Sequence, residues 1–264
     1  MRTLSLFFAM LALLLTACQG GSSNQEQAQQ EEAAPEMKYT VTPFSPSKSY
    51  PNAKIESMSF NNGKFEFKLN DSDYQLGVQT PDAGQKMCAN SAQGQHIHLI
   101  VDKEPYAAKY EASFDYEIPD GDHYILAFLS RSYHESIKTE GAHVAVKAVI
   151  KGNSMTESMP TPVNTPMLFY SRPKGTYTGK AETEKVMLDF YLVNAKLGAE
   201  YKVKADINGE EHIIDSWQPY YIEGLPMGEN TIKLTLVDAQ GNAVDTPLNP
   251  VSRTFTLQED PVEQ

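Results

Sequence analysis

The feature that most constrains the fold is a series of short runs in which apolar and polar residues alternate with a period of two. Such alternation places every second side chain on one face of an extended chain and is typical of half-buried β-strands. We find no convincing helix pattern from Met37 onward. The runs, bounded by Gly, Pro, Asn and Asp, predict an all-β protein built from immunoglobulin-like β-sandwiches. They are residues 64–69, 96–101, 123–129, 144–150, 186–192, 201–207, 230–237 and 253–257.

An internal repeat divides this part of the chain in two. In residues 118–129 a Pro and a Gly lead into an alternating strand, and residues 225–236 repeat that pattern at an offset of 107 residues from Gly121 to Gly228. This offset is about the size of one sandwich domain. A stretch rich in Pro separates the copies. We therefore predict tandem domains, with an N-terminal sandwich at 37–151, a linker at 152–166, a C-terminal sandwich at 167–258 and a tail at 259–264.

The first 36 residues are predicted to lie outside the fold. Arg2 precedes an apolar run at residues 4–15, which is too short to span a bilayer of ~30 Å and is typical of a secretory signal peptide. The run ends in Leu-Thr-Ala-Cys18, which resembles the bacterial lipobox, so we expect residues 1–17 to be removed and Cys18 to be acylated. Residues 18–36 are rich in Gln and Glu and cannot form a packed core, so they are predicted to be a tether.

These features predict a lipoprotein of the cell envelope whose partner is the lipid bilayer, bound through acylated Cys18. Gln19 follows the cysteine where an Asp would favour the inner membrane, so we expect the outer membrane, on either its periplasmic or its surface face. The net charge of −12 argues against nucleic acid as a partner. We find no nucleophile elbow, phosphate-binding Gly-rich loop, His-Glu-x-x-His motif or closely spaced carboxylate pair, so the protein is predicted not to be an enzyme.

Histidines are concentrated in the first copy of the repeat. His96 and His98 are two residues apart on a predicted strand, so both imidazoles project from one face. His123 begins a later strand and His134 follows its end. Imidazole is a ligand of copper and zinc. We predict that these four histidines bind copper or zinc; the alternative is that they are incidental, because a solvent-facing strand can carry two histidines without a metal.

Three residues near this strand are candidates for further contacts with the metal. Met87 and Cys88 lie in a segment of the first copy that the second copy lacks, and each offers a soft sulfur ligand. A free Cys88 in the envelope is otherwise buried or paired with another chain. Asp102 ends the His96–His98 strand and could bind the metal or orient an imidazole.

Parts of both copies resemble known proteins. Residues 94–102 (Gly-Gln-His-Ile-His-Leu-Ile-Val-Asp), Pro105, residues 119–123 (Pro-Asp-Gly-Asp-His) and residues 132–134 (Ser-Tyr-His) resemble a bacterial periplasmic β-domain family of unknown function. The resemblance covers about residues 60–150 and implies that His96, His98, Asp102, His123 and His134 form one site. This chain lacks the Gly-Gly-x-x-Glu-Thr-like stretch of that family. Residues 169–175 and 217–221 resemble lipoproteins of the Bacteroidota.

A second function remains open from the sequence. Trp217, Tyr220 and Tyr221 lie between strands of the second copy and could form an interaction surface for a glycan or an envelope protein, although a role in the core is more common for aromatic residues. The protein would then be a structural or interaction lipoprotein without a metal. A third and weaker alternative is phosphopeptide binding, since residues 130–134 faintly resemble the Ser-Arg-x-His of forkhead-associated domains.

Overall fold

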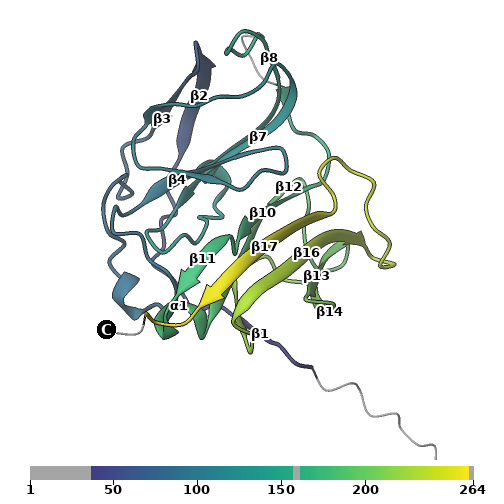
Figure 1. Ribbon diagram of the computed structural model, residues 1–264. Coiled ribbons are helices and arrows are strands. Elements are labelled where there is room, and N and C mark those ends of the chain that lie inside the picture. Colours follow the sequence, from purple (N-terminus) through teal and green to yellow (C-terminus); the bar gives the residue numbers. More distant parts are fainter. Residues whose placement is uncertain (1–36, 157–160, 262–264) are drawn as a thin grey trace, which may run out of the picture. The chain divides into compact units, whose positions relative to one another are not determined.

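The computed structural model describes residues 37–156 and 161–261 (Figure 1). The predicted signal peptide, Cys18 and the tether lie outside these residues, and so do the last three residues of the predicted tail. In the described part of the chain, no helix is long and apolar enough to cross a membrane.

The described residues form seventeen strands, one short α-helix and two single-turn 3-10 helices, the latter at Ala83–Gln85 and Glu140–Ala142. The first nine strands are β1 (Thr40–Pro43), β2 (Ile55–Asn61), β3 (Lys64–Leu69), β4 (His96–Val101), β5 (Ala107–Lys109), β6 (Ser113–Asp115), β7 (Gly121–Ser130), β8 (His143–Ile150) and β9 (Thr161–Pro162). The others are β10 (Met167–Arg172), β11 (Gly175–Thr178), β12 (Val186–Val193), β13 (Tyr201–Ile207), β14 (Glu210–Ile214), β15 (Tyr220–Glu223), β16 (Gly228–Asp238) and β17 (Val251–Gln258), with α1 at Lys180–Thr183.

The strands form two β-sandwiches, which confirms the predicted all-β class. Outer sheet 1 has the order β2-β3-β6 and packs on inner sheet 1, which has the order β5-β4-β7-β8-β9. Inner sheet 2 has the order β1-β15-β12-β10 and packs on outer sheet 2, which has the order β11-β17-β16-β13-β14. Each sandwich encloses its own apolar core. Every alternating run noted in the sequence lies within one of these strands.

Both copies of the repeat share a strand topology. In the first copy β4 pairs with β5 and β7, and β7 pairs with β8. In the second copy β13 pairs with β14 and β16, and β16 pairs with β17. Asn62-Gly63 connects β2 to β3 and Asn208-Gly209 connects β13 to β14 in hairpins. The Asn-Gly sequence is typical of such turns, and all four residues have the positive φ that a type I′ turn requires.

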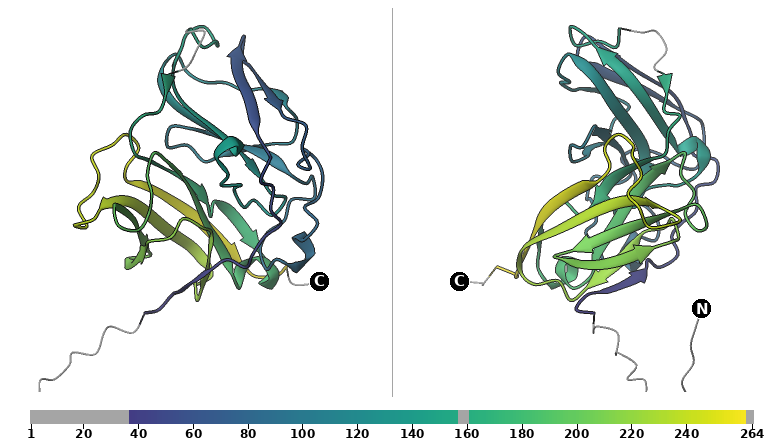
Figure 2. Two further views of the ribbon diagram at one scale, coloured as in Figure 1. Left: turned by 180° about the vertical axis from the view of Figure 1, so that it is seen from behind. Right: turned by 90° about the vertical axis from the view of Figure 1, so that its right-hand side faces the viewer.

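The boundaries of the sandwiches differ from those predicted at two points. β1 pairs with β15, so the first strand of the chain belongs to the second sandwich, although residues 37–151 were assigned to the first (Figure 2). β9, placed in the linker at 152–166, pairs with β8 at the edge of inner sheet 1. β1 and β15 lie far apart in the chain, and β9 lies in the stretch between the two copies, so the repeat in the sequence reveals neither pairing.

The two sandwiches also pack against each other through their inner sheets (Figure 1). Ile100 and Phe128 of inner sheet 1 meet Phe169 and Tyr191 of inner sheet 2 in a third apolar cluster. β4 and β12 are therefore buried along their whole length, because each has a sandwich core on one face and the other sandwich on the second face. The four sheets form consecutive layers, and the candidate site lies between the two inner ones.

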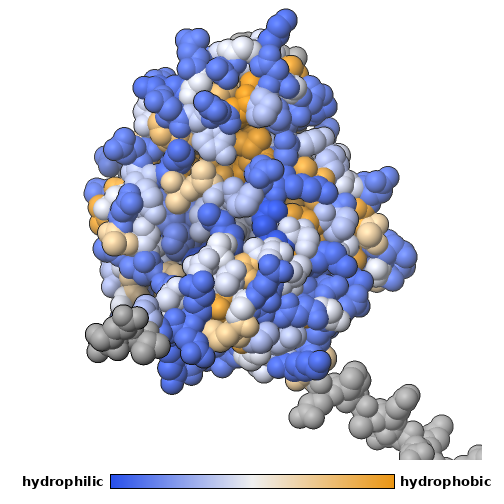
Figure 3. Space-filling view, in the orientation of Figure 1, coloured by the Kyte–Doolittle hydropathy of each residue, from blue (hydrophilic) through white to orange (hydrophobic). Residues whose placement is uncertain are grey.

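The surface is predominantly hydrophilic on the face shown in Figure 3, with smaller hydrophobic patches. Large apolar side chains that are exposed in the described residues are separate positions: Met37, Val78, Met87, Val149, Ile213 and Met227. Isolated exposed apolar residues of this kind are normal for folded proteins and need no partner to explain them.

Candidate metal centre

The position of β4 explains why His96 and His98 are buried. Ile97 and Leu99 point into the core of the first sandwich, so the residues between them must point the other way, toward inner sheet 2. Both imidazoles are fully buried at that interface. The alternative of a solvent-facing strand is therefore wrong, because the second sandwich covers this face.

His134 reaches the same place from a different segment. It ends a tight turn after β7, where its backbone N–H donates to the Arg131 carbonyl at 2.9 Å. Its φ is +67°, in the left-handed region where His is found more often than most residues. β7 pairs with β4 so that Ser130 lies opposite His96, and the turn that follows carries His134 back over that histidine.

Three imidazole nitrogens converge at this point. His96 Nε2 lies 2.8 Å from His98 Nε2 and 3.0 Å from His134 Nδ1. Each residue offers one nitrogen, and the three lie within 4.8 Å of one another. Zinc–imidazole bonds of about 2.0–2.1 Å in a tetrahedron place their nitrogens about 3.3 Å apart. The two distances from His96 Nε2 are a few tenths of an ångström shorter than this, so the rings would have to move apart there to hold a metal ion.

Hydrogen bonds orient these rings for coordination. His96 Nδ1–H donates to the Gly94 carbonyl at 2.8 Å, which leaves the lone pair on Nε2 facing the other two histidines. His98 Nδ1 lies 3.4 Å from the hydroxyl of Ser171 on β10, a second such partner. Each supporting group faces the ring nitrogen that is directed away from the other histidines.

Aromatic rings enclose the cluster. Tyr106 stacks on His98 with centroids 3.6 Å apart and an interplanar angle of 9°, and its hydroxyl lies 3.3 Å from His134 Nδ1. Tyr110 covers His96 at 4.9 Å, and Phe128 lies 4.9 Å from His98. His134 and Tyr110 are partly exposed, so the cluster meets solvent on their side.

Burial keeps the three imidazoles neutral, which is the form that binds a metal. Desolvation lowers the pKa of His96 to about 4. The hydrogen bond from His96 to the Gly94 carbonyl raises this pKa, but by less. Desolvation likewise holds the pKa values of His98 and His134 well below the usual range, and the positive charge of Arg172 lowers both further. At neutral pH all three imidazoles are therefore neutral, so no positively charged ring opposes the binding of a metal ion.

His123 does not join this cluster, and its assignment as a ligand is wrong. It lies at the start of β7, seven residues before Ser130, and thus about 24 Å along the strand from the end that approaches His96. Both of its ring nitrogens have oxygen partners, since Nδ1 is 2.7 Å from Asp102 Oδ2 and Nε2 is 2.9 Å from the Pro119 carbonyl. One ten-residue strand cannot bring its start and its end to one site.

The second copy of the repeat shows what His123 and Asp102 do. Asn230, at the position of His123, donates to the Pro226 carbonyl at 2.8 Å and pairs with Asn208 at 2.8 Å. Asn208 has a φ of +48°, and its side chain accepts the backbone N–H of Thr231, which follows Asn230 on β16. In the same way Asp102 has a φ of +53°, and its side chain accepts the backbone N–H of Tyr124, which follows His123 on β7. The His123–Asp102 pair is therefore the counterpart of a structural pair of asparagines.

The sulfur residues lie apart from the imidazole nitrogens. Met87 is exposed, and Cys88 is free and packs beside an apolar cluster that includes Phe44, Met187 and Tyr221. Burial raises the pKa of the Cys88 thiol to about 12. Among the described residues, the group that could hold a metal contains no cysteine and no carboxylate. The structure therefore contradicts Cys88 and Asp102 as members of the centre.

Two other predicted surfaces are also corrected. Tyr220 and Tyr221 are buried, and only Trp217 of the three remains partly exposed, with its indole N–H donating to the Phe190 carbonyl at 3.1 Å. Strand β15 lies between β1 and β12 in inner sheet 2, and its first three residues are all buried. Arg131, the candidate for phosphate recognition, is buried and pairs with Glu135 at 3.3 Å. Phosphopeptide binding at that residue is thereby excluded.

Reasoning from the sequence missed four residues around the centre: Tyr106, Ser171, Arg172 and Lys174. The sequence contained one indication of them, because Ser171 and Arg172 end a run of apolar residues that is typical of a buried strand. A charged residue is almost never fully buried without a partner. Their location beside the histidines depends on the packing of the two sandwiches, which the sequence pattern does not report.

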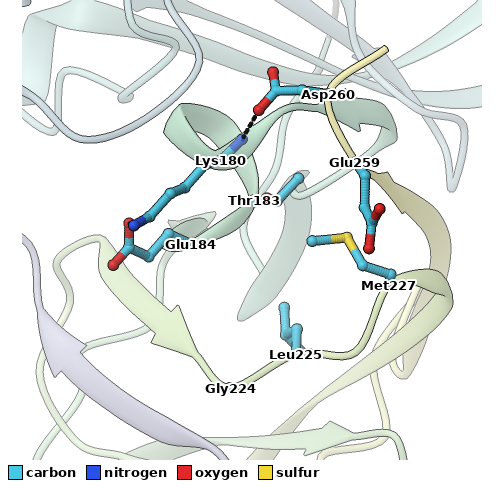
Figure 4. A pocket seen from close by; sticks show the side chains of 8 residues that line it. All are labelled: Lys180, Thr183, Glu184, Gly224, Leu225, Met227, Glu259 and Asp260. Atoms are coloured by element: carbon cyan, nitrogen blue, oxygen red, sulfur yellow. Dashed lines mark hydrogen bonds and ion pairs between the residues drawn. The ribbon is translucent and has the colours of Figure 1, made fainter. Parts of the chain in front are cut away.

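A separate cavity of about 550 Å³ lies at another part of the second sandwich (Figure 4). It is lined by α1, by the turn between β15 and β16 and by residues after β17. Its charged groups pair with one another, since the Lys180 backbone N–H donates to Asp260 at 3.2 Å and the Lys180 ammonium lies 3.8 Å from Glu184. We find no histidine or cysteine in its lining.

Comparison with known proteins gives no family for the chain: no family model and no curated protein matches it. Among solved structures, it is similar to fibronectin(III)-like modules of Clostridium thermocellum CbhA, with 17% identity and a TM-score of 0.28 over 36% of this chain and 100% of that chain. A Ca²⁺-stabilized adhesin that helps an Antarctic bacterium bind ice is 12% identical over 79% of this chain and 50% of that chain, with a TM-score of 0.25. The chain thus matches half the length of the adhesin.

A third similar structure is SGBP-B from the mixed-linkage glucan utilization locus of Bacteroides ovatus, in complex with a heptasaccharide. It is 10% identical over 83% of this chain and 70% of that chain, with a TM-score of 0.20. At these identities and TM-scores, the likenesses carry no inference about what this chain binds.

Proposed function

We propose that this protein is a lipid-anchored, non-enzymatic binding module of the bacterial cell envelope that holds one copper or zinc ion at His96, His98 and His134. The observation that carries the proposal is the convergence of three neutral imidazole nitrogens at a buried interface, with supporting hydrogen bonds on the opposite nitrogens of His96 and His98. Imidazole ligands favour copper and zinc over magnesium or calcium. The predicted lipobox supports attachment to the bilayer through Cys18.

Metal binding is tested on residues 37–264, which form one compact unit. We expect one Cu(II) or Zn(II) ion per chain in titration calorimetry, and a rise in melting temperature on addition of the metal. The double variant His96→Gln/His98→Gln should lose both effects. The matched control is His123→Asn, which removes an imidazole outside the cluster and introduces the residue of the second copy. Absence of metal binding by the folded wild-type protein would refute the proposal.

The anchor is tested separately on the full-length chain in bacteria. Incorporation of a labelled fatty acid and sedimentation with membranes are expected for the wild type. Both should be lost in Cys18→Ala. A chain that is secreted without the label would contradict the lipoprotein assignment and leave the metal site unaffected.

Glycan binding is a second candidate with one observation in its favour. Trp217 lines an open cleft of about 560 Å³ together with Lys138, Asn194 and Glu200. A partly exposed indole beside polar side chains is suited to stacking against a sugar ring. Retention of the wild-type protein on a polysaccharide gel, and loss of this retention in Trp217→Ala, would establish this function. Elution of the wild type with the buffer would exclude it.

A further inference from the structure

A buried cation lies next to the histidine cluster. Arg172, at the end of β10, is 4% exposed. Its Nε–H and one Nη2–H donate to the Tyr177 hydroxyl at 3.1 and 2.8 Å, while its Nη1 is buried and has no hydrogen-bond partner among the residues that the structure describes. Within the described residues it forms no ion pair with a carboxylate. A fully buried guanidinium is normally paired, because removing a charge from water is unfavourable unless an opposite charge compensates it.

Further positive charge gathers around Arg172. Lys174, partly buried, places its ammonium 4.2 Å from the centroid of the Tyr106 ring, the ring that stacks on His98. Burial lowers the pKa of Lys174, and the charges of Arg172 and Arg253 lower it further. In the described part of the chain, neither Lys174 nor Arg253 forms an ion pair with an acidic side chain.

Unsatisfied donors occur in the same region. Besides Arg172 Nη1, the Tyr170 hydroxyl and Arg253 Nε are buried and have no hydrogen-bond partner within residues 37–156 and 161–261. The Arg253 guanidinium lies 5.6 Å from the centroid of the Tyr170 ring. Buried donors without acceptors are rare in folded proteins, and a group of them indicates a missing acceptor.

Two contacts place the backbone of Arg172 and the side chain of Lys174 near the imidazoles, and the charge of Arg172 lowers the pKa values of His98 and His134. Ser171, which precedes Arg172, lies 3.4 Å from His98 Nδ1, and Tyr106 connects Lys174 to His98 by stacking. The centre itself contains no carboxylate among the described residues. A divalent metal held by three neutral imidazoles would thus lie close to two further cations that, among the described residues, form no ion pair with a carboxylate.

We propose that the metal at His96, His98 and His134 takes a small oxyanion as its fourth ligand, and that Arg172 and Lys174 hold the same anion. Three protein ligands leave one position of a tetrahedral metal open. Guanidinium and ammonium groups bind carboxylate, carbonate and phosphate oxygens through charge-assisted hydrogen bonds. This inference rests on the proposed metal site and adds to it the class of ligand that the module recognises: an oxyanion bound together with its metal.

The test uses Co(II) as a coloured substitute for zinc in residues 37–264. The visible absorption of the Co(II) protein is recorded during titration with acetate, bicarbonate or phosphate at constant ionic strength, with perchlorate as a weakly coordinating control. We expect a saturable change with at least one oxyanion and none with perchlorate. Comparison of the three titrations identifies whether a carboxylate, a carbonate or a phosphate is preferred.

Variants identify the residues that hold the anion. Lys174→Gln should weaken anion binding about tenfold, which corresponds to about 1.4 kcal/mol, and Arg172→Gln by more, because each variant removes a charge-assisted hydrogen bond to the anion. Both should still bind Co(II). Lys180→Gln, which removes an exposed ammonium in the cavity of Figure 4, is the matched control and should bind the anion as the wild type does.

Three outcomes separate this inference from the proposed function. Co(II) binding with no spectral response to any oxyanion would overturn the inference and leave the metal site intact. An equal response in wild type and Lys174→Gln, a partly exposed position where the variant should fold, would overturn the role of the cationic residues. Failure of the wild type to bind Co(II) or Zn(II) would overturn both proposals.

Discussion

Acidification of the metal-free protein should unfold it through the buried histidines. Burial lowers the pKa of His96 from 6.5 to about 4. Below pH 6.5 the unfolded chain binds a proton at this residue, whereas the folded chain does not until the pH approaches 4. The free energy of unfolding therefore decreases progressively as the pH falls from 6.5 to about 4. Above pH 6.5, His96 makes no pH-dependent contribution to stability.

The magnitude follows from the shift in pKa. A difference of about 2.5 pH units at about 1.36 kcal/mol per unit corresponds to about 3 kcal/mol, nearly all of it lost between pH 6.5 and 4. His98 and His134 add to this loss in the same direction, since their pKa values are also held down by burial. A loss of this size is a large fraction of the 5–15 kcal/mol that is typical of a folded protein.

The assay is urea unfolding of residues 37–264 in the presence of a chelator, followed by circular dichroism at several pH values from 7 to 4. His96→Gln cannot gain a proton, so its free energy of unfolding should fall by about 3 kcal/mol less than that of the wild type over this range. Titration of carboxylates is common to both proteins and cancels in the comparison. Parallel curves for wild type and variant would refute the claim that burial keeps His96 neutral.

Three further results are expected. His123→Asn combined with Asp102→Asn introduces the pair of asparagines found in the second copy. This double variant should change the free energy of unfolding by less than about 1 kcal/mol in urea titrations and should bind the metal as the wild type does. Loss of metal binding would show that His123 or Asp102 contributes to the metal centre. Asp189→Ala leaves the ammonium of Lys138, 2.6 Å from that buried carboxylate, without its partner between the sandwiches. It should destabilise the protein by about 3 kcal/mol in the same assay, and a neutral effect would contradict this pairing. The Cys88 thiol, with its pKa raised to about 12, should react with a disulfide reagent at pH 8 far more slowly in the native than in the denatured protein, and equal rates would show that it is accessible.

The histidines show where prediction from the sequence succeeds and where it fails. Two-residue spacing on a strand was enough to place His96 and His98 on one face, because the pleat of a strand alternates side chains regardless of the rest of the fold. The same information could not distinguish His123 from His134 as the third ligand. That choice depends on the antiparallel register of β4 and β7, in which the end of β7 and not its start lies beside His96.

By itself, the sequence determined the all-β class, the strands, the Asn-Gly turns and the duplication, because alternation and turn chemistry act over a few residues. Only the tertiary structure decided that β1 joins the second sandwich and that the inner sheets pack face to face. This packing turns His96 and His98 from surface residues into buried ones and brings Arg172 beside them. The contacts between β4 and β10, which are about 75 residues apart, depend on the register of the strands and on the match of two apolar faces. Neither of these is encoded in the local sequence pattern of β4 or β10.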